Sequence, residues 1–144
     1  MRLFAFLLVS ILGAALAAAA VASSGTDVSW RKTAIGNAIT TTDGRTLYLF
    51  RGDHGTTSEC YGQCASYWPP LLTSGSPKAT GLVKSSLLGT TKRKDGKLQV
   101  TYKGHPLYTF VGDKKAGQTA GEGSNASGAK WYALAPSGAT IDKD

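Results

Sequence analysis

Two cysteines separated by three residues, Cys60 and Cys64, are the side chains of this sequence best suited to covalent chemistry. In an exported chain an isolated pair most simply forms a disulfide, and a helical segment would place the two α-carbons about 6 Å apart, within the range of a disulfide. The alternatives are a redox pair or a metal site, but the spacing is not Cys-x-x-Cys and no histidine follows Cys64. We expect a structural disulfide that fixes the segment leading into Trp68.

A second arrangement combines two aromatic residues with a carboxylate and occurs twice, as Tyr48-x-Phe50-x-x-Asp53 and Tyr108-x-Phe110-x-x-Asp113. Each aspartate is expected on the loop that leaves a strand, where it accepts the tyrosine hydroxyl or binds backbone N–H groups of its own turn. This interpretation makes the motif a folding device. The alternatives are a shared groove in which both carboxylates bind a cation or a sugar, and a glycosidase pair, although nothing in the sequence gives the two carboxylates different environments.

Histidine supplies the weaker candidates for a metal site. His54 follows Asp53 directly, whereas His105 lies at a predicted hairpin turn, so the two are not at equivalent positions of the duplicated motif. A metal site would need the histidines to meet, with Asp53 or Asp113 as a third ligand. We expect two surface histidines instead, and we predict no metal and no cofactor.

The sequence contains no complete set of catalytic residues. The serines lack a Gly-x-Ser-x-Gly motif, and the glycines of 117–128 do not lead from a strand directly into a helix, as a phosphate-binding loop requires. The single methionine is the initiator, which excludes a thioether copper site and Met-ligated haem from the mature chain. We therefore expect a protein that is not an enzyme.

The duplicated motif lies inside a longer internal repeat. When the chain is offset by 60 residues, 41–53 lies over 101–113, and Thr, Gly, Leu, Tyr, Phe, Gly and Asp recur at matched positions. Trp68-Pro69-Pro70-Leu71 also lies near Trp131-Tyr132-Ala133-Leu134, with a slip of three residues. The pattern indicates a tandem duplication of a unit of about 60 residues.

Each unit predicts two strands around a turn that contains glycine: 38–42 and 47–50 around Asp43-Gly44, and 98–102 and 107–110 around Lys103-Gly104. Residues 94–97 predict another hairpin turn, and short helical pieces fit around 60–67 and 83–88. The glycine-rich segment 116–130 has almost nothing to bury, so we expect a long flexible loop there. We predict an all-β or β-dominated fold in which two repeats, about 35–75 and 95–140, form one compact pseudo-symmetric domain over residues 23–144.

The first 22 residues predict an export signal. Arg2 gives a positive start, an apolar run follows over 3–12, and Ala20-Val21-Ala22 fits a cleavage site after Ala22. The alternative is a retained anchor over 3–21, which is nearly long enough to span a membrane. With cleavage, the mature chain is soluble, has no stable membrane anchor, and is periplasmic or secreted.

The charge of the chain bears on its partners. The full sequence has a formal net charge of +7, and part of the excess lies in the run Lys92-Arg93-Lys94. This run has no nucleic-acid-binding motif and no interleaved aromatics, so we expect a solvated hairpin tip and no nucleic-acid partner. We expect the partner to be an unknown envelope protein, a polymer or a small ligand. Most of the aromatics are expected in the core, although an exposed subset could stack on a sugar or another planar ligand: Tyr61, Tyr67, Trp68, Trp131 and Tyr132.

The two Tyr-x-Phe-x-x-Asp motifs, together with Cys60-x-x-x-Cys64-Ala65-x-x-Trp68-Pro69-Pro70-Leu71, resemble the bacterial secreted repeat of unknown function. That family consists of predicted lipoproteins with a Tyr-x-aromatic-x-x-Asp motif, and the resemblance covers about 35–144. It implies an exported location but no mechanism. This chain has Ser23 where a lipoprotein would carry its lipidated cysteine.

Two functional hypotheses follow. The first is an exported envelope protein that acts by binding or by structural association, without catalysis. The second is a periplasmic electron-transfer or metal-handling accessory that uses Cys60, Cys64, His54 or His105.

Overall fold

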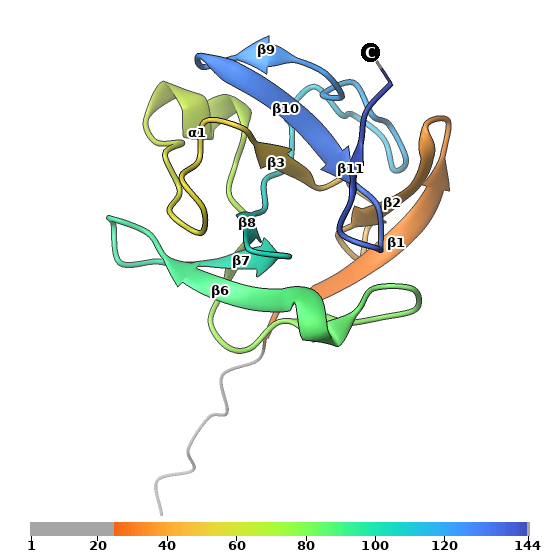
Figure 1. The fold of residues 1–144 in the computed structure, drawn as a ribbon, viewed down its shortest axis with the longest axis horizontal. Helices are drawn as coiled ribbons and strands as arrows, with labels where there is room; N and C mark the ends of the chain where they lie inside the picture. The colour runs from red at the N-terminus through yellow and green to blue at the C-terminus, as the bar shows by residue number, and fades with distance from the viewer. Residues whose placement is uncertain (1–24, 144) are drawn as a thin grey trace, which may run out of the picture.

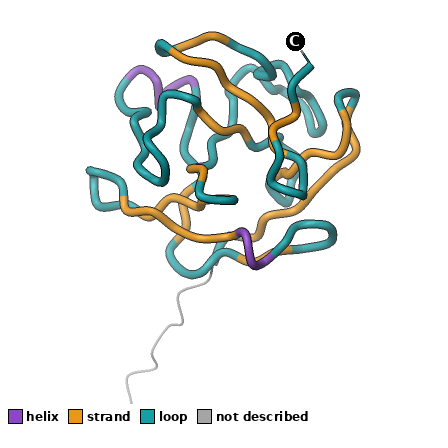
Figure 2. The backbone as a smooth tube through the Cα atoms, viewed as in Figure 1, coloured by secondary structure: helices purple, strands orange, loops and turns teal. Residues whose placement is uncertain are grey.

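The structure is a computed structural model that describes residues 25–143. The predicted signal peptide and its cleavage site lie outside the described residues. Within residues 25–143, no helix has the length and apolar character needed to cross a membrane. The fold is strand-dominated and contains two repeats of one unit, as predicted, and loops and turns connect short strands throughout (Figure 2).

The first sheet has the strand order β2-β1-β5. It contains β1 (Asp27–Thr33), β2 (Gly36–Thr40) and β5 (Lys78–Ala79). Strands β1 and β2 form an antiparallel hairpin, and β5 adds two residues in parallel to β1. The strand β1 was not predicted from the sequence. Its central residues Trp30 to Lys32 lie at or near the surface, so the segment lacks the apolar alternation that indicates a half-buried strand.

The second sheet crosses the upper part of the view in Figure 1. Its strand order is β11-β10-β3, with β9 paired to β10. The bounds are β3 (Tyr48–Phe50), β9 (Asn125–Ala126), β10 (Ala129–Leu134) and β11 (Thr140–Ile141). The strand β3 belongs to the first repeat and β10 to the second, so this sheet joins the two repeats.

The third sheet has the order β4-β7-β6, with β8 paired to β7. It contains β4 (Leu72–Thr73), β6 (Leu88–Lys92), β7 (Leu98–Tyr102) and β8 (His105–Pro106). The predicted turns at 94–97 and 103–104 connect β6 to β7 and β7 to β8. The return strand predicted over 107–110 is wrong in extent, because only His105 and Pro106 pair with β7. The following residues make single bridges instead, Tyr108 to Tyr48 and to Pro70.

Two short helices interrupt the strands. Helix α1 (Gln63–Tyr67) and the 3₁₀ helix η1 (Ser85–Leu87) fall within the predicted helical segments. Gly62 lies before α1 with a φ of 57°, a left-handed conformation that favours glycine.

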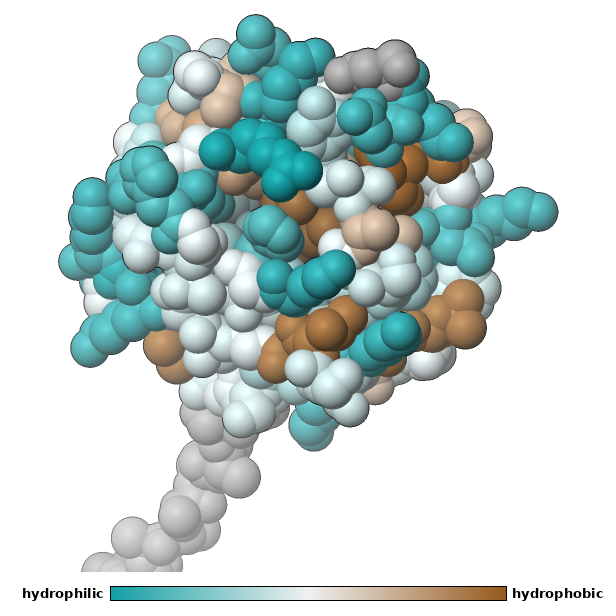
Figure 3. Space-filling view, viewed as in Figure 1, coloured by the Kyte–Doolittle hydropathy of each residue, from teal (hydrophilic) through white to brown (hydrophobic). Residues whose placement is uncertain are grey.

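Strand β3 separates two hydrophobic clusters of the described residues. Leu47 and Leu49 point into one cluster with Val100 and Leu107, while Tyr48 and Phe50 point into the other, in agreement with the alternation of side chains along a strand. Both clusters combine residues of both repeats. On the face drawn in Figure 3, the remaining hydrophobic residues lie in small separate patches.

The segment 116–130 was predicted to be a flexible loop, and this prediction is wrong for much of its length. Its backbone bonds to other elements, including Gly117 N–H to the Gly44 carbonyl at 2.9 Å and Gly123 N–H to the Trp131 carbonyl at 2.9 Å. A Cβ atom at Gly121 would lie 2.8 Å from the Trp68 ring. Gly121 therefore lets the backbone pack directly against the rings of Trp68 and Tyr48.

Candidate functional site

Four aromatic rings form a continuous stack between the two repeats. Their order is Phe50, Trp131, Trp68, Phe110, with centroid distances of 4.3, 3.9 and 4.3 Å. The two tryptophans are almost parallel, at an interplanar angle of 7°. Each end of the stack is the phenylalanine of one motif, and each central ring is the tryptophan that follows a motif. The repeated pattern of the sequence thus corresponds to a repeated pattern of ring contacts.

A glycine covers each end ring. A Cβ atom at Gly52 would lie 2.3 Å from the Phe50 ring, and one at Gly112 would lie 2.2 Å from the Phe110 ring. The chain therefore folds back over the phenylalanine only because no side chain is present there. This contact explains why the glycine precedes the aspartate in both motifs.

The two tyrosines bind the aspartates of the opposite repeat. The Tyr48 hydroxyl donates to Asp113 Oδ2 at 2.7 Å, and the Tyr108 hydroxyl lies 3.1 and 3.0 Å from the two oxygens of Asp53. Their backbones also pair directly, with Tyr48 N–H donating to the Tyr108 carbonyl at 2.8 Å and the reverse bond at 3.0 Å. The sequence predicted that each aspartate serves its own unit, and the structure exchanges them across the pseudo-symmetric junction.

Each aspartate also binds backbone N–H groups of the loop that follows it. Asp53 Oδ1 accepts from Glu59 N–H at 2.8 Å, and Asp113 Oδ1 accepts from Ala120 N–H at 2.8 Å. This part of the motif agrees with the prediction. Asp113 is buried and Asp53 is half-buried, and both carboxylates lie at the junction of the two repeats.

Burial changes the acidity of these groups. Removal from water raises the pKa of Asp53 to about 6 and also raises the pKa of Asp113, although hydrogen bonds to both carboxylates act in the opposite direction. The pKa values of Tyr48 and Tyr108 are raised too, first by burial and then by their carboxylate neighbours. At neutral pH both tyrosines therefore keep the proton that they donate.

A buried arginine extends one tyrosine–aspartate pair into a longer chain. Arg93 Nη1 donates to Ser58 Oγ at 2.8 Å, and Ser58 Oγ lies 2.6 Å from the Tyr108 hydroxyl. Because the Tyr108 proton points to Asp53, Ser58 donates to Tyr108. The sequence predicted Arg93 on a solvated hairpin tip, but its side chain is buried and its Nη2 bonds to the Cys60 carbonyl at 2.7 Å. The reason is that carbonyl and hydroxyl acceptors surround the guanidinium and replace water.

The predicted disulfide between Cys60 and Cys64 is present, with α-carbons 5.3 Å apart. It links the segment before α1 to the second residue of the helix. Cys60 is fully buried, whereas Cys64 is partly exposed at the pocket described below. The disulfide therefore holds α1 against the stacked rings.

Neither histidine takes part in the ring stack or in the tyrosine–aspartate bonds. His54 is exposed and its Nδ1 lies 3.5 Å from Glu59 Oε1. The half-buried His105 has a lowered pKa because of burial and the nearby charges of Arg51 and Lys103. In residues 25–143, no group of three or more His, Cys, Asp or Glu side chains is arranged to hold a metal ion. The absence of a cofactor stays a prediction.

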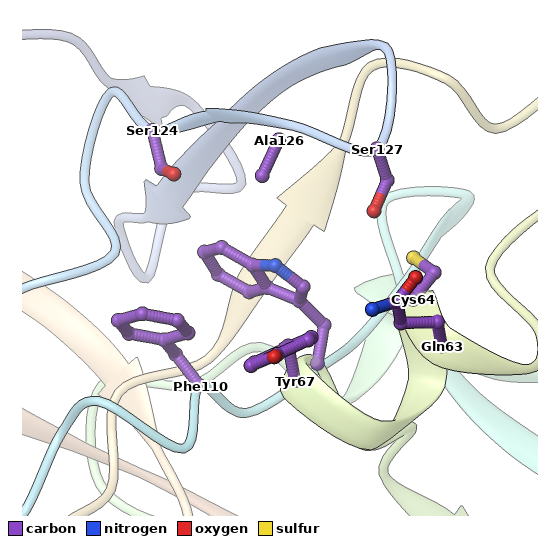
Figure 4. A pocket seen from close by; sticks show the side chains of 8 residues that line it. Gln63, Cys64, Tyr67, Phe110, Ser124, Ala126 and Ser127 are labelled. Carbon is purple, nitrogen blue, oxygen red and sulfur yellow. The ribbon is translucent and has the colours of Figure 1, made fainter.

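A pocket of about 430 Å³ opens at the Phe110 end of the ring stack. Figure 4 shows Phe110 and Tyr67 along one side of it and Ser124, Ala126 and Ser127 along the other. The first repeat contributes α1 and the second contributes Phe110 and the β9–β10 hairpin. The ring of Tyr67 remains available to a ligand, because the residue is 53% exposed.

Polar side chains in this pocket have hydrogen-bonding capacity left over. Among the described residues, no hydrogen bond engages the Gln63 side-chain amide or the hydroxyls of Ser124 and Ser127. Ser127 also has a φ of 58°, an unusual conformation for a residue with a side chain. It forms the two-residue turn between β9 and β10 together with Gly128, whose φ is 89°.

The sequence interpretation did not identify Gln63, Ser124 or Ser127 as site residues. The Ser-Gly dipeptide at 127–128 does carry a turn signal. That signal was hidden inside a segment whose composition is typical of a flexible loop. Tyr67 was named among the aromatics with a possible binding role, and the structure places it at the pocket.

A family model described as a secreted repeat of unknown function matches the chain twice, over residues 29–72 and 89–135. Each match contains one Tyr-x-Phe-x-Gly-Asp motif, and both begin about six residues before the predicted repeats. Comparisons with curated proteins and with solved structures found no match. Since the two matched ranges cover more than half of the sequence, this chain belongs to the family of secreted repeats of unknown function.

Proposed function

We propose that this protein is an exported, non-enzymatic ligand-binding module of the periplasm or the cell exterior, and that the pocket between α1 and the β9–β10 hairpin is its binding site. One observation carries the proposal. The pocket combines exposed aromatic surface at Tyr67 with three polar side chains, of Gln63, Ser124 and Ser127, that have no partner among the described residues. Concave sites with an aromatic wall and a few polar groups are typical of small-molecule binding.

The position of the carboxylates supports a role without catalysis. Asp53 and Asp113 bind tyrosine hydroxyls and backbone N–H groups inside the junction, and neither lines the pocket. A general acid or base must lie within hydrogen-bond reach of its substrate. A ligand in this pocket would meet hydroxyls, an amide and rings.

The experiment is a ligand screen by amide NMR on the mature, disulfide-bonded protein. The probes are short saccharides, nucleosides and indole derivatives, and binding should shift the amide resonances of Gln63 and Ser127. Tyr67→Ala should weaken the shift, whereas Leu82→Ala should not. The pair is matched, because the two side chains are 53% and 50% exposed and Leu82 lies at a different surface. If no probe shifts these resonances, the proposal is wrong.

A specific observation also favours the electron-transfer alternative. The four stacked rings lie close enough for an electron to move from one ring to the next. Tyr48 contacts Trp68 edge-on at a centroid distance of 5.5 Å, and its hydroxyl bonds to Asp113. One-electron oxidation of Tyr48 by a photogenerated ruthenium(III) complex would pass the electron to ruthenium and the proton to Asp113 Oδ2. A tyrosyl radical signal that is the same in Tyr48→Phe as in the wild type would contradict this role.

A further inference from the structure

We infer that the ligand of this pocket is an uncharged saccharide, whose ring lies on the aromatic wall and whose hydroxyls bond to the opposite rim. The inference rests on the proposed function and names its ligand class. It follows from the charge of the pocket, from the way its two sides differ, and from the unengaged groups on the rim.

The lining of the pocket disfavours an ionic ligand. The eight described residues that line it include no lysine, arginine, aspartate or glutamate. A charged ligand group would lose its hydration here without gaining an opposite charge, which is unfavourable. The basic surplus of the sequence is therefore not used at this site, and a neutral ligand fits best.

The two sides of the pocket differ in chemistry. Rings of Phe110 and Tyr67 line one side, and small or hydroxyl-bearing side chains of Ser124, Ala126 and Ser127 line the other (Figure 4). A pyranose has one face of C–H groups, which suits the negative face of an aromatic ring, and an edge of hydroxyls. A flat heteroaromatic ring has two apolar faces, and one of them would meet the serine hydroxyls.

The unengaged groups match sugar hydroxyls in their bonding capacity. Serine hydroxyls and the glutamine amide can each donate and accept, as can every hydroxyl of a sugar. Gln63, Ser124 and Ser127 together surround the pocket from α1 and from the loop and turn next to β9. The volume of about 430 Å³ is within the usual range for small-molecule sites.

The turn residue Ser127 is a separate indication. Its left-handed backbone conformation would be easier for Gly or Asn, so the local preference of the turn is not what selects a serine there. Residues held in rare backbone conformations concentrate at ligand sites. Lys103 has the same conformation outside the pocket, so the indication comes from the conformation of Ser127 together with its place in the pocket lining.

The test is an NMR titration of the mature, disulfide-bonded protein with neutral trisaccharides of glucose and of N-acetylglucosamine. Tri-galacturonic acid, tri-glucosamine, adenosine and indole are the comparison probes. At least one neutral saccharide should shift the amides of Gln63, Ser124 and Ser127, with an affinity at least about tenfold above that of the charged saccharides. Tyr67→Ala should lower this affinity about tenfold, and Leu82→Ala should leave it unchanged.

A second pair of variants separates binding from folding. Ser127→Gly keeps the turn but removes the hydroxyl, so it should weaken saccharide binding. Lys103→Gly changes the corresponding residue of the β7–β8 turn and should not. If adenosine or indole binds at the pocket and neutral saccharides do not, the saccharide inference is wrong and the proposed function stands. If no probe shifts the pocket amides, both are wrong.

Discussion

At the residue scale, the motif of this chain is a set of contacts between the two repeats. The tyrosine donates to the opposite aspartate, the phenylalanine caps a stack of rings, and the glycine makes room over that phenylalanine. Each residue type is required by one of these contacts. Packing and hydrogen bonding therefore explain the spacing of the motif.

Removing the Tyr108 hydroxyl should destabilise the fold. Tyr108→Phe removes the hydroxyl that donates to Asp53 and accepts from Ser58, so the free energy of unfolding should fall by about 1–3 kcal/mol. Urea denaturation measures the loss. Tyr132→Phe is the control, because the Tyr132 ring is partly buried but its hydroxyl bonds to none of the described residues. Equal, negligible changes in both variants would show that the Tyr108 bond does not contribute.

The two carboxylates at the junction, of buried Asp113 and half-buried Asp53, should give the protein an unusual dependence on pH. The pKa of Asp53 is raised from 3.8 to about 6 in the fold, so between these values the folded state binds more protons than the unfolded state. Stability then increases as the pH falls from about 6 towards 4, and Asp113 contributes with the same sign. This contribution is absent above pH 6.

Asp53→Asn tests the origin of that dependence. The amide oxygen can still accept from Glu59 N–H and from Tyr108, but there is no charge to bury. The melting temperature at pH 7 should rise, and its change between pH 4 and 7 should become smaller. Asp27→Asn, at an exposed residue, should change neither. A melting temperature of Asp53→Asn that keeps the wild-type pH profile would contradict this assignment.

At the element scale, two hairpins have a residue with a side chain at a left-handed turn position. Ser127 has a φ of 58° and Lys103 a φ of 48°, and each is followed by a glycine. Ser127→Gly and Lys103→Gly should each raise the free energy of unfolding by roughly 0.5–1 kcal/mol, because the cost of the left-handed conformation is removed. Thermal denaturation of both variants checks this. A loss of stability in either would mean that its side chain contributes more than the turn strain costs.

Some elements could be predicted from the sequence and others could not. Asp95-Gly96 and Lys103-Gly104 are turn signals, and both turns were predicted correctly, although the strand after Lys103-Gly104 is shorter and begins earlier than predicted. Arg93 was misplaced because a charge inside a basic run normally lies in water, and only the tertiary contacts with Ser58 and Cys60 satisfy it. The sequence also could not predict which aspartate each motif tyrosine binds. Spacing along the chain gives the distance to an aspartate but not the symmetry that brings two repeats together.

At the scale of the whole molecule, the two repeats depend on each other. Strand β3 of the first repeat pairs with β10 of the second, and β4 pairs with β7. Both hydrophobic clusters also combine residues of the two repeats. Because a chain of about 60 residues buries only a marginal core, a repeat that loses these partners should not fold.

Cutting the chain between Gly75 and Ser76 tests this dependence. The fragments 23–75 and 76–144 should each be unfolded, with poorly dispersed amide NMR spectra, and should regain structure when mixed. Trp68 and Trp131 come from different fragments and stack at 3.9 Å, so their coupled far-ultraviolet circular dichroism should appear only in the mixture. A first fragment that unfolds cooperatively on its own would show that a single repeat is sufficient. Even then the pocket would be incomplete in that fragment, because Phe110 and the β9–β10 hairpin come from the second repeat.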